Sequence, residues 1–415
     1  MKEPLFTKNF TLLILGQISS LFGNFILKFA LSMYVLEVIG SAAIFAGILA
    51  FATIPTIILS PFGGILADRV NRRNIMVVLD IMSGVCVLCV ALLFNGQNAI
   101  IMIGILLVIL SALGAFETPT VQACIPQMHK GDNIIKGNAL VNQVAAIASL
   151  LSPIFGSMLY VAFGLTSVMY IVLFCFFLTA TFEYFIQLEY KKEEKIEKIT
   201  TIVKMDFLDS MRFICQQEPT IIKMLSLSTL ISFFVVGVVL VGFPFMIRNI
   251  LEMNVKMYGI AESIIGFSAI VGGIVAATFT KKLKISKLFW MIAFIGICFI
   301  LSGVVFFLSV GVGIKYIITI ISFCSFQAMV CIFSIFVLSY IQQKTPNSLM
   351  GKVMSYISTI SVCSQPFSQT VYGILFDKFH SEVYFVLIPT GFMIVILGLL
   401  SKRFFEKINN EKVLT

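Results

Sequence analysis

Long apolar runs separated by short polar segments dominate the chain. A helix needs about 20 apolar residues to cross the hydrocarbon core of a bilayer, which is about 30 Å thick. Runs of this kind occupy residues 10–38, 42–66, 75–94, 99–123, 138–163 and 166–187, and then 221–247, 258–280, 288–310, 316–342, 353–376 and 383–400. The pattern therefore predicts an all-α integral membrane protein with twelve transmembrane helices.

A charged stretch divides these runs into two sets of six. Residues 189–218 mix Lys and Glu, which is typical of a surface helix or a solvated connector. We expect an N-terminal six-helix bundle over residues 1–188, a cytoplasmic linker over 189–218, and a C-terminal six-helix bundle with a short cytoplasmic tail over 219–415. An even number of spans with basic loops on one side places both termini in the cytoplasm.

The two halves share a faint repeat. The second run ends in Gly63-Gly64-Ile65-Leu66-Ala67, and the eighth contains Gly272-Gly273-Ile274-Val275-Ala276 near its end. Each precedes a basic loop, which predicts two six-helix pseudo-repeats in the same orientation.

Composition agrees with a membrane location and excludes other classes. Of the 415 residues, 59% are hydrophobic and 12% charged, with a mean hydropathy of +1.04. The net charge of +9 arises from Lys and Arg concentrated on one side of the membrane, so it does not predict nucleic-acid binding. The nine cysteines lie mostly in apolar runs and only two histidines exist, so we expect no metal site and no cofactor. The sequence contains no phosphate-binding loop and no nucleophile motif, so it does not predict an enzyme.

The loop after the second run concentrates charge. One acid and three arginines lie close together at Asp68, Arg69, Arg72 and Arg73, four residues beyond Gly64. A carboxylate here can face the N-terminus of another helix, where unpaired N–H groups attract negative charge.

Two acids inside later runs lie at the same membrane level as this loop. We interpret Asp80 and Glu117 as partners of the arginines in a cytoplasmic charge network that locks one conformation. Ordinary interfacial charges without a switching role are the alternative.

Lys28 lies too deep in the first run to be a flanking charge. Polar residues recur at helical spacing around it, which places them on one face: Gln17, Ser20, Asn24, Lys28 and Ser32. Such a stripe should face a water-filled cavity or the bundle interior. Glu262, at a comparable outer depth in the eighth run, is a candidate counter-charge for Lys28. A snorkelling lysine and an interfacial glutamate are the alternatives.

The tenth and eleventh runs carry uncharged polar groups among aromatic residues. Gln327, Ser361 and Gln365 are candidates for lining a cavity that takes a bulky amphipathic ligand. Hydrogen bonding between helices explains them equally well.

The spacing Gly64-x3-Asp68-Arg69-x2-Arg72-Arg73 resembles the loop between the second and third spans of the major facilitator superfamily. Asn71 stands where that family usually has glycine, and Asn tolerates a left-handed backbone better than most residues. Pro153 and Gly156 resemble part of the antiporter motif of the family's drug exporters, although close helix packing or a kink explains them equally. Gly137-Asn138 and Thr345-Pro346 lie in stretches similar to the macrolide-efflux and enterobactin-exporter branch.

The resemblance implies a carrier that exports a drug, antibiotic or siderophore-like compound from a bacterial cell by alternating access and proton antiport. Asp68 would then dock near Gly351 at the start of the eleventh span. The fourth span lacks an arginine that many drug/proton antiporters have, so the buried acids would have to couple proton flow. The implied partners are a small molecule, protons and the lipid bilayer, and the implied state is a monomer. A lipid or nutrient carrier, or a non-transporting sensor or immunity protein, remains an alternative.

Overall fold

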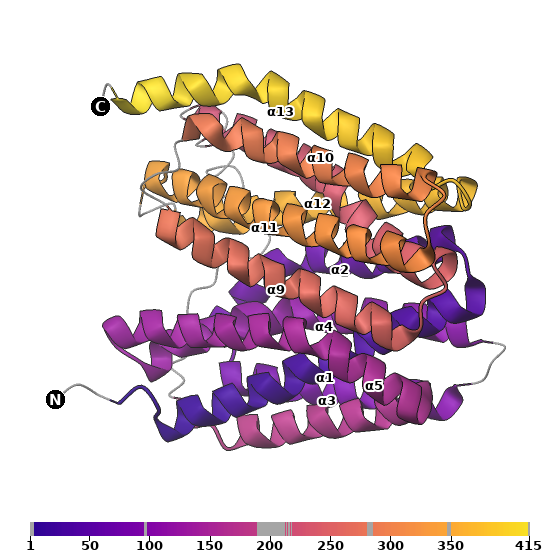
Figure 1. Cartoon of the computed structure of the whole chain (residues 1–415). Coiled ribbons are helices and arrows are strands. Elements are labelled where there is room, and N and C mark those ends of the chain that lie inside the picture. Colours follow the sequence, from indigo (N-terminus) through magenta and orange to yellow (C-terminus); the bar gives the residue numbers. More distant parts are fainter. Residues whose placement is uncertain are drawn as a thin grey trace. The chain divides into compact units, whose positions relative to one another are not determined.

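The computed structural model describes residues 4–94, 98–188, 212, 214, 216, 218–279, 285–346 and 350–413. Within these ranges every regular element is a helix (Figure 1). The chain forms two compact units: Met1–Val38 with Ile48–Phe207, and Ile39–Gly47 with Leu208–Thr415. The predicted linker lies almost wholly outside the described residues, so the predicted bundle boundaries stay a prediction.

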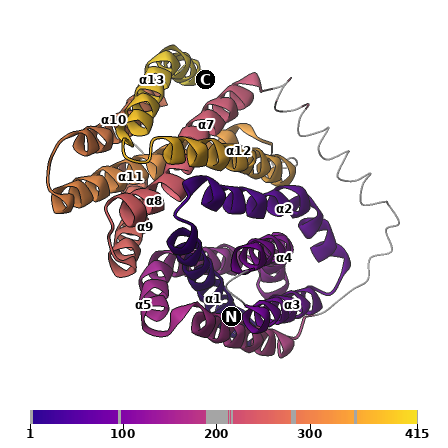
Figure 2. The ribbon, with the colours of Figure 1, turned by 90° about the vertical axis from the view of Figure 1, so that its right-hand side faces the viewer.

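The first unit contains four long helices and most of a fifth. They are α1 (Lys8–Ile39), α2 (Ala42–Arg69), α3 (Arg72–Leu93), α4 (Ala99–Met128) and α5 (Asp132–Tyr184). α3 packs against both α4 and α5, and these helices are seen nearly end-on in Figure 2. Phe10, Met76 and Cys124, from α1, α3 and α4, are fully buried in one apolar cluster. These contacts hold α1, α3 and α4 together beside the site described below.

α5 is two helices that meet at Gly164. This glycine has φ 75° and ψ 171°, a backbone conformation that side chains strongly disfavour. The two arms on either side of Gly164 correspond to the predicted fifth and sixth spans.

The second unit begins with a helix of mixed type. α7 (Pro219–Gly237) continues through η2 (Val238–Gly242), α8 (Phe243–Phe245) and η3 (Met246–Ile250). η2 and η3 are π-helical, and Pro244 lies between them. Proline has no N–H to donate and its ring crowds the preceding turn, which accounts for a local departure from α-helical bonding.

The rest of this unit consists of long α-helices with one short 3-10 turn. They are α9 (Val255–Phe279), η4 (Ile285–Lys287), α10 (Leu288–Phe307), α11 (Val312–Lys344), α12 (Met350–Lys378) and α13 (Tyr384–Val413). α10 packs against α11 and α13, α11 against α9, and α12 against α7.

Ten helices among the described residues are long and apolar enough to cross a membrane. The twelve-span expectation differs from this number at two places. The two arms of α5 form one continuous candidate, and α12, which coincides with the predicted eleventh span, is too polar to qualify. The all-α membrane fold is confirmed, while ten rather than twelve candidates are found.

Large apolar side chains cover the outside of the helices. Phe51, Phe174 and Leu400 are 68%, 66% and 72% exposed. A soluble protein rarely presents so much apolar surface, whereas a bilayer makes it favourable.

The sequence repeat has a structural counterpart. A Cβ at Gly63 in α2 would lie 2.5 Å from the carbonyl oxygen of Ala115 in α4. A Cβ at Gly272 in α9 would lie 2.6 Å from the carbonyl oxygen of Ala328 in α11. The first glycine of each motif therefore lets the backbone of another helix approach closely, and it does so at equivalent places in the two halves.

A carboxylate caps the N-terminus of α2. Asp377, at the end of α12, accepts hydrogen bonds from the backbone N–H groups of Ala42 (2.6 Å) and Ala43 (3.1 Å) and from the Ser41 hydroxyl (2.6 Å). Ser41 Oγ in turn accepts from the N–H of Ile44 at 3.3 Å. All of these residues belong to the second unit, so the first turn of α2 is fixed to α12.

Candidate functional site

A polar cavity of about 300 Å³ opens within the first unit between α1, α2, α4 and α5. Its polar lining residues are Gln17, Asn24, Lys28, Thr56, Ser111, Glu117, Thr118, Gln122 and Asn142, and its apolar ones include Leu21, Phe25, Leu110 and Val121. Gln17, Asn24 and Lys28 come from the predicted polar stripe, so the helical spacing placed them together as expected.

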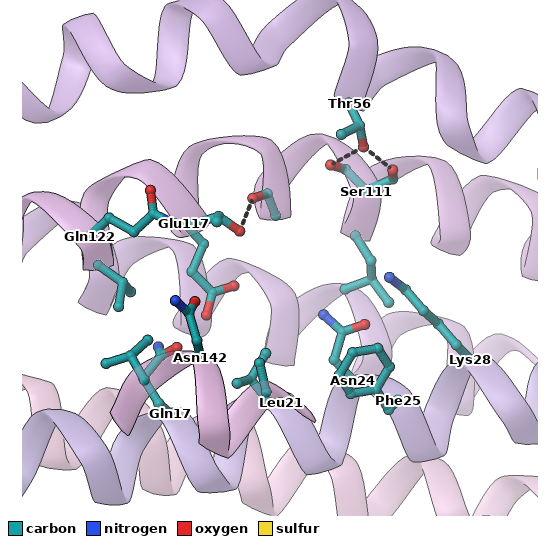
Figure 3. A pocket seen from close by; sticks show the side chains of 16 residues that line it. Gln17, Leu21, Asn24, Phe25, Lys28, Thr56, Ser111, Glu117, Gln122 and Asn142 are labelled. Atoms are coloured by element: carbon teal, nitrogen blue, oxygen red, sulfur yellow. Dashed lines mark hydrogen bonds between the residues drawn. The ribbon is translucent and has the colours of Figure 1, made fainter. Parts of the chain in front are cut away.

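A basic and an acidic side chain line this cavity. Lys28 on α1 is exposed, Glu117 on α4 is half-buried, and the two lie near enough for their charges to interact (Figure 3). Thr56 and Ser111, whose hydroxyl oxygens are 2.7 Å apart, join α2 to α4 beside it. An acid, a base and neutral polar groups on apolar walls are the features of a site for an amphipathic ligand.

Glu117 is also connected to the interior of the unit. The Ser20 hydroxyl lies 3.2 Å from Glu117 Oε1 and 3.2 Å from Asp80 Oδ1. Asp80 is only 1% exposed. The structure therefore brings Asp80 and Glu117, which were expected at one membrane level, together through Ser20 of α1. Their pairing with the arginines of the loop stays a prediction.

A third carboxyl, Glu183, was missed by sequence analysis. It is fully buried in the last turn of α5 and within hydrogen-bonding reach of the Asp80 carboxyl. Because it lies near the charged linker, it looks like an ordinary flanking charge. The sequence did offer one indication, because Thr179 is a second polar residue one turn earlier on the same face of this helix. In the structure Thr179 is also fully buried, and it donates to Gly16 O of α1 at 3.2 Å.

The basic loop lies at the same end of the unit as these acids. Arg72 donates to Ala67 O at 2.8 Å and to Ala123 O at 2.7 Å, and thereby neutralises carbonyls near the ends of α2 and α4. The Arg73 guanidinium lies 5.6 Å from the centroid of the Tyr184 ring and contacts Asn74 Oδ1. Arg69 lies at the C-terminus of α2. The side chains of Asp68 and Lys352 lie outside the described set, and so do the surroundings of Gly64 and Gly351.

Asn71 does not use the left-handed backbone that asparagine tolerates. Its φ is −60°, and its side chain accepts a hydrogen bond from the N–H of Arg73 at 3.1 Å. Asn71 therefore acts as the N-cap of α3, a role that favours Asn for its side-chain oxygen.

The predicted helix packing motif lies at a close contact of α5 with α1. A Cβ at Gly156 would lie 3.0 Å from Phe29 Cδ1, and Pro153 is buried one turn earlier in α5. This geometry is typical of a packing role.

Candidate residues of the second half are divided among three helices. Ser361 lines a second, mostly apolar cavity of about 440 Å³ between α7, α11 and α12. Gln327 in α11 and Gln365 in α12 are half-buried and are not among its lining residues. Glu262 in α9 is half-buried and hydrogen-bonds the hydroxyl of Tyr258, one turn earlier. Glu262 and Lys28 belong to different units, so their pairing stays a prediction.

The sequence is similar to a known efflux protein over part of its length. Macrolide efflux protein A of Streptococcus pyogenes is 28% identical over 156 residues, which cover 37% of this chain and 38% of that protein. The match thus spans about two fifths of the relative.

Solved structures of transporters share the fold along nearly the whole chain. The nucleoside transporter NupG gives a TM-score of 0.74 at 13% identity, covering 95% of this chain and 98% of that one. A D-xylose-proton symporter gives 0.73 at 16% identity, covering 94% and 96%. A bacterial homologue of the iron transporter ferroportin, in an inward-facing state, gives 0.70 at 14% identity, covering 95% and 98%.

The family model of the Major Facilitator Superfamily matches residues 13–369. This match confirms the expectation of a membrane transporter in place of an enzyme. The chain belongs to the Major Facilitator Superfamily.

Proposed function

We propose that the protein exports an amphipathic small molecule by alternating access, in exchange for protons. The observation that carries this proposal is the cavity of the first unit, which Lys28 and Glu117 line together with apolar side chains. The similarity to a macrolide efflux protein supports export and supports a drug or antibiotic as cargo.

The charged pair defines the expected cargo chemistry. A ligand with a basic group can replace Lys28 at Glu117, and an acidic or hydroxyl-bearing group can turn to Lys28. The apolar walls provided by Leu21, Phe25 and Leu110 then bury the rest of the molecule. Ser361 and the apolar cavity of the second unit are a candidate second contact, with Gln327 and Gln365 as further candidates.

The conformational latch remains part of the proposal. Asp68 would dock on the N-terminus of the eleventh span near Gly351 and hold one side of the carrier closed, with Arg69, Arg72 and Arg73 supporting that loop. An Asp68→Asn variant keeps the shape but loses the charge, so we expect it to lose transport while remaining folded. Unchanged transport and an unchanged conformational distribution in Asp68→Asn would contradict the latch.

The remaining features of the proposal are two six-helix bundles over residues 1–188 and 219–415, cytoplasmic termini, a monomeric state and a place in the bacterial inner membrane. Gly156 and Pro153 would hold α5 close to α1 as the bundle moves.

The test is proton flux in inverted vesicles that contain the protein. Macrolides, fluoroquinolones, tetracyclines, dyes and catecholate siderophores are added in turn to vesicles with a preformed pH gradient. We expect one class to collapse the gradient and to require about tenfold higher concentration in Glu117→Gln or Lys28→Ala, a change of about 1.4 kcal/mol in binding. Glu37→Gln is the matched control, because Glu37 lies on α1 outside the cavity and bonds the Tyr160 hydroxyl at 2.8 Å.

Import of a nutrient is the second candidate. The structural similarity to a D-xylose-proton symporter favours it, because that protein is named for sugar and proton moving together. Uptake of a sugar or nucleoside into right-side-out vesicles, with no response to any drug class, would replace export by import. Substrate-dependent lipid scrambling in liposomes would instead indicate a lipid carrier.

A further inference from the structure

Asp80 and Glu183 form a buried carboxyl pair that the cavity does not include. They come from α3 and α5, are 1% and 0% exposed, and lie within hydrogen-bonding reach of each other. Neither is among the residues that line the cavity. Two carboxyls that are buried next to each other need a proton or a cation between them, because two carboxylates can only accept hydrogen bonds.

The described side chains and backbone groups offer this pair few hydrogen-bond donors. Asp80 Oδ2 and both carboxyl oxygens of Glu183 have no hydrogen-bond donor among the described groups. The Ser20 hydroxyl carries one proton and lies 3.2 Å from both Asp80 Oδ1 and Glu117 Oε1, so it can satisfy one of them at a time.

Other titratable groups surround the pair. From α4 these are Glu117 and the buried thiol of Cys124, which lies near both Glu183 and Arg72 of α3. α1 presents the Ser20 hydroxyl to the pair and Lys28 to the cavity, and α5 places Tyr184 next to Glu183 in sequence. Arg72 donates to the carbonyls of Ala67 and Ala123.

We propose that Asp80 and Glu183 share one exchangeable proton and are the site of the coupling ion in this carrier. The proposal rests on the proposed exchange of cargo for protons. A proton is favoured over a metal ion, because no group of three His, Cys, Asp or Glu side chains in the described part of the chain is placed to hold a metal.

Ser20 connects this site to the cargo cavity. The proton leaves the pair when Ser20 Oγ accepts it from Asp80 and passes its own proton to Glu117 Oε1, which releases it to the cavity. One proton moves from the pair to the cavity, and the Ser20 hydroxyl is unchanged at the end. Cargo with a basic group at Glu117 and the arriving proton therefore compete for the same carboxylate, which is the requirement for exchange in opposite directions.

The test combines infrared spectroscopy with two transport assays. In purified protein, we expect the signal of a buried protonated carboxyl, which disappears as pH is raised and when cargo is added. Glu183→Gln and Asp80→Asn should each abolish this signal, whereas Glu37→Gln should keep it. In liposomes, Asp80→Asn and Glu183→Gln should each lose the accumulation of cargo that a pH gradient drives. Both should keep the exchange of labelled for unlabelled cargo, which needs no proton.

Two further variants keep the test informative if a first variant does not fold. Glu183→Asp retains a carboxyl and should restore the infrared signal if Glu183→Gln does not fold. Ser20→Ala removes the relay while leaving both acids, so the signal should remain and its response to cargo should slow at least tenfold.

The outcomes separate this proposal from the proposed function. An infrared signal that survives both Asp80→Asn and Glu183→Gln would overturn the proton site, and so would accumulation that follows a sodium gradient instead of pH. A titrating signal lost in both variants, in a protein that moves none of the compounds tested, would support the site and contradict the proposed cargo.

Discussion

Gly272 and Gly273 are neighbours in the sequence of α9 but differ in the space around them. A Cβ at Gly272 would lie 2.6 Å from Ala328 O and 2.9 Å from Ala328 Cα, both backbone atoms that cannot rotate away. Gly272→Ala should therefore push α9 from α11 and cost about 1–3 kcal/mol of stability. A lower melting temperature in detergent would be the measurement.

Gly273→Ala is the matched control for that change. The nearest atom to its new Cβ is Cys331 Sγ at 4.0 Å, an ordinary contact. The control should melt like the unmodified protein. Equal melting temperatures for both variants would show that the close approach at Gly272 does not limit stability.

Sequence patterns were informative for residues whose role is set by spacing along one helix. Helical periodicity placed Gln17, Asn24 and Lys28 in one cavity. Glu183 could not be found in this way, because its partner Asp80 is on another helix and its burial depends on how α3 and α5 pack. Asn71 was interpreted through its backbone preference, whereas its side-chain oxygen turned out to matter.

At the scale of elements, the N-terminus of α2 depends on a residue of α12. Asp377→Ala would leave the N–H groups of Ala42 and Ala43 without their acceptor. We expect a loss of about 1–2 kcal/mol, the usual range for a lost helix cap. Hydrogen exchange at residues 42 and 43 should accelerate, and the melting temperature should fall.

Glu382→Ala is the control for this prediction, because Glu382 is an exposed acid just after the end of α12. It should change neither exchange nor melting. Unaltered exchange at residues 42 and 43 in Asp377→Ala would show that the cap is dispensable for α2.

Hydropathy predicted the position of most helices but not their backbone irregularities. The break in α5 at Gly164 falls between the fifth and sixth predicted runs, which end at residue 163 and begin at residue 166. α12 carries so many Ser, Thr and Gln residues that it does not qualify as an apolar span. The sequence nevertheless predicted a helix there, over residues 353–376. The π-helical stretches on either side of Pro244 had no counterpart in the pattern, since proline alone does not specify how the surrounding bonds rearrange.

The whole molecule consists of two compact units, and their boundaries do not coincide with the ends of helices. Residues 39–47, which contain the first turn of α2, belong to the second unit. A hydropathy pattern assigns each helix to one bundle, because it contains no information on contacts between one end of a helix and a distant part of the chain. The cavity with Lys28 and Glu117 lies wholly in the first unit and the apolar cavity with Ser361 wholly in the second.

The number of membrane crossings can be measured at internal positions. With twelve crossings, a label on a cysteine introduced at Glu218 would react on the same side as one introduced near Pro4. With ten crossings, in which α5 crosses once and α12 not at all, Glu218 would lie on the opposite side. We expect the same side, because Gly164 provides the reversal that α5 needs between its two arms. Labelling of Glu218→Cys from the opposite face only would contradict two crossings by α5.

The break at Gly164 also determines which experiments can reveal the topology. Joining the two arms of α5 removes one crossing, and discounting α12 removes another, so both counts are even. With either number of crossings the two ends of the chain lie on the same side of the membrane. A reporter fused to either end therefore gives the same answer for ten crossings as for twelve. Only the segment between α5 and α12 changes sides, so the orientation of the helices in this segment depends on the backbone conformation at one glycine.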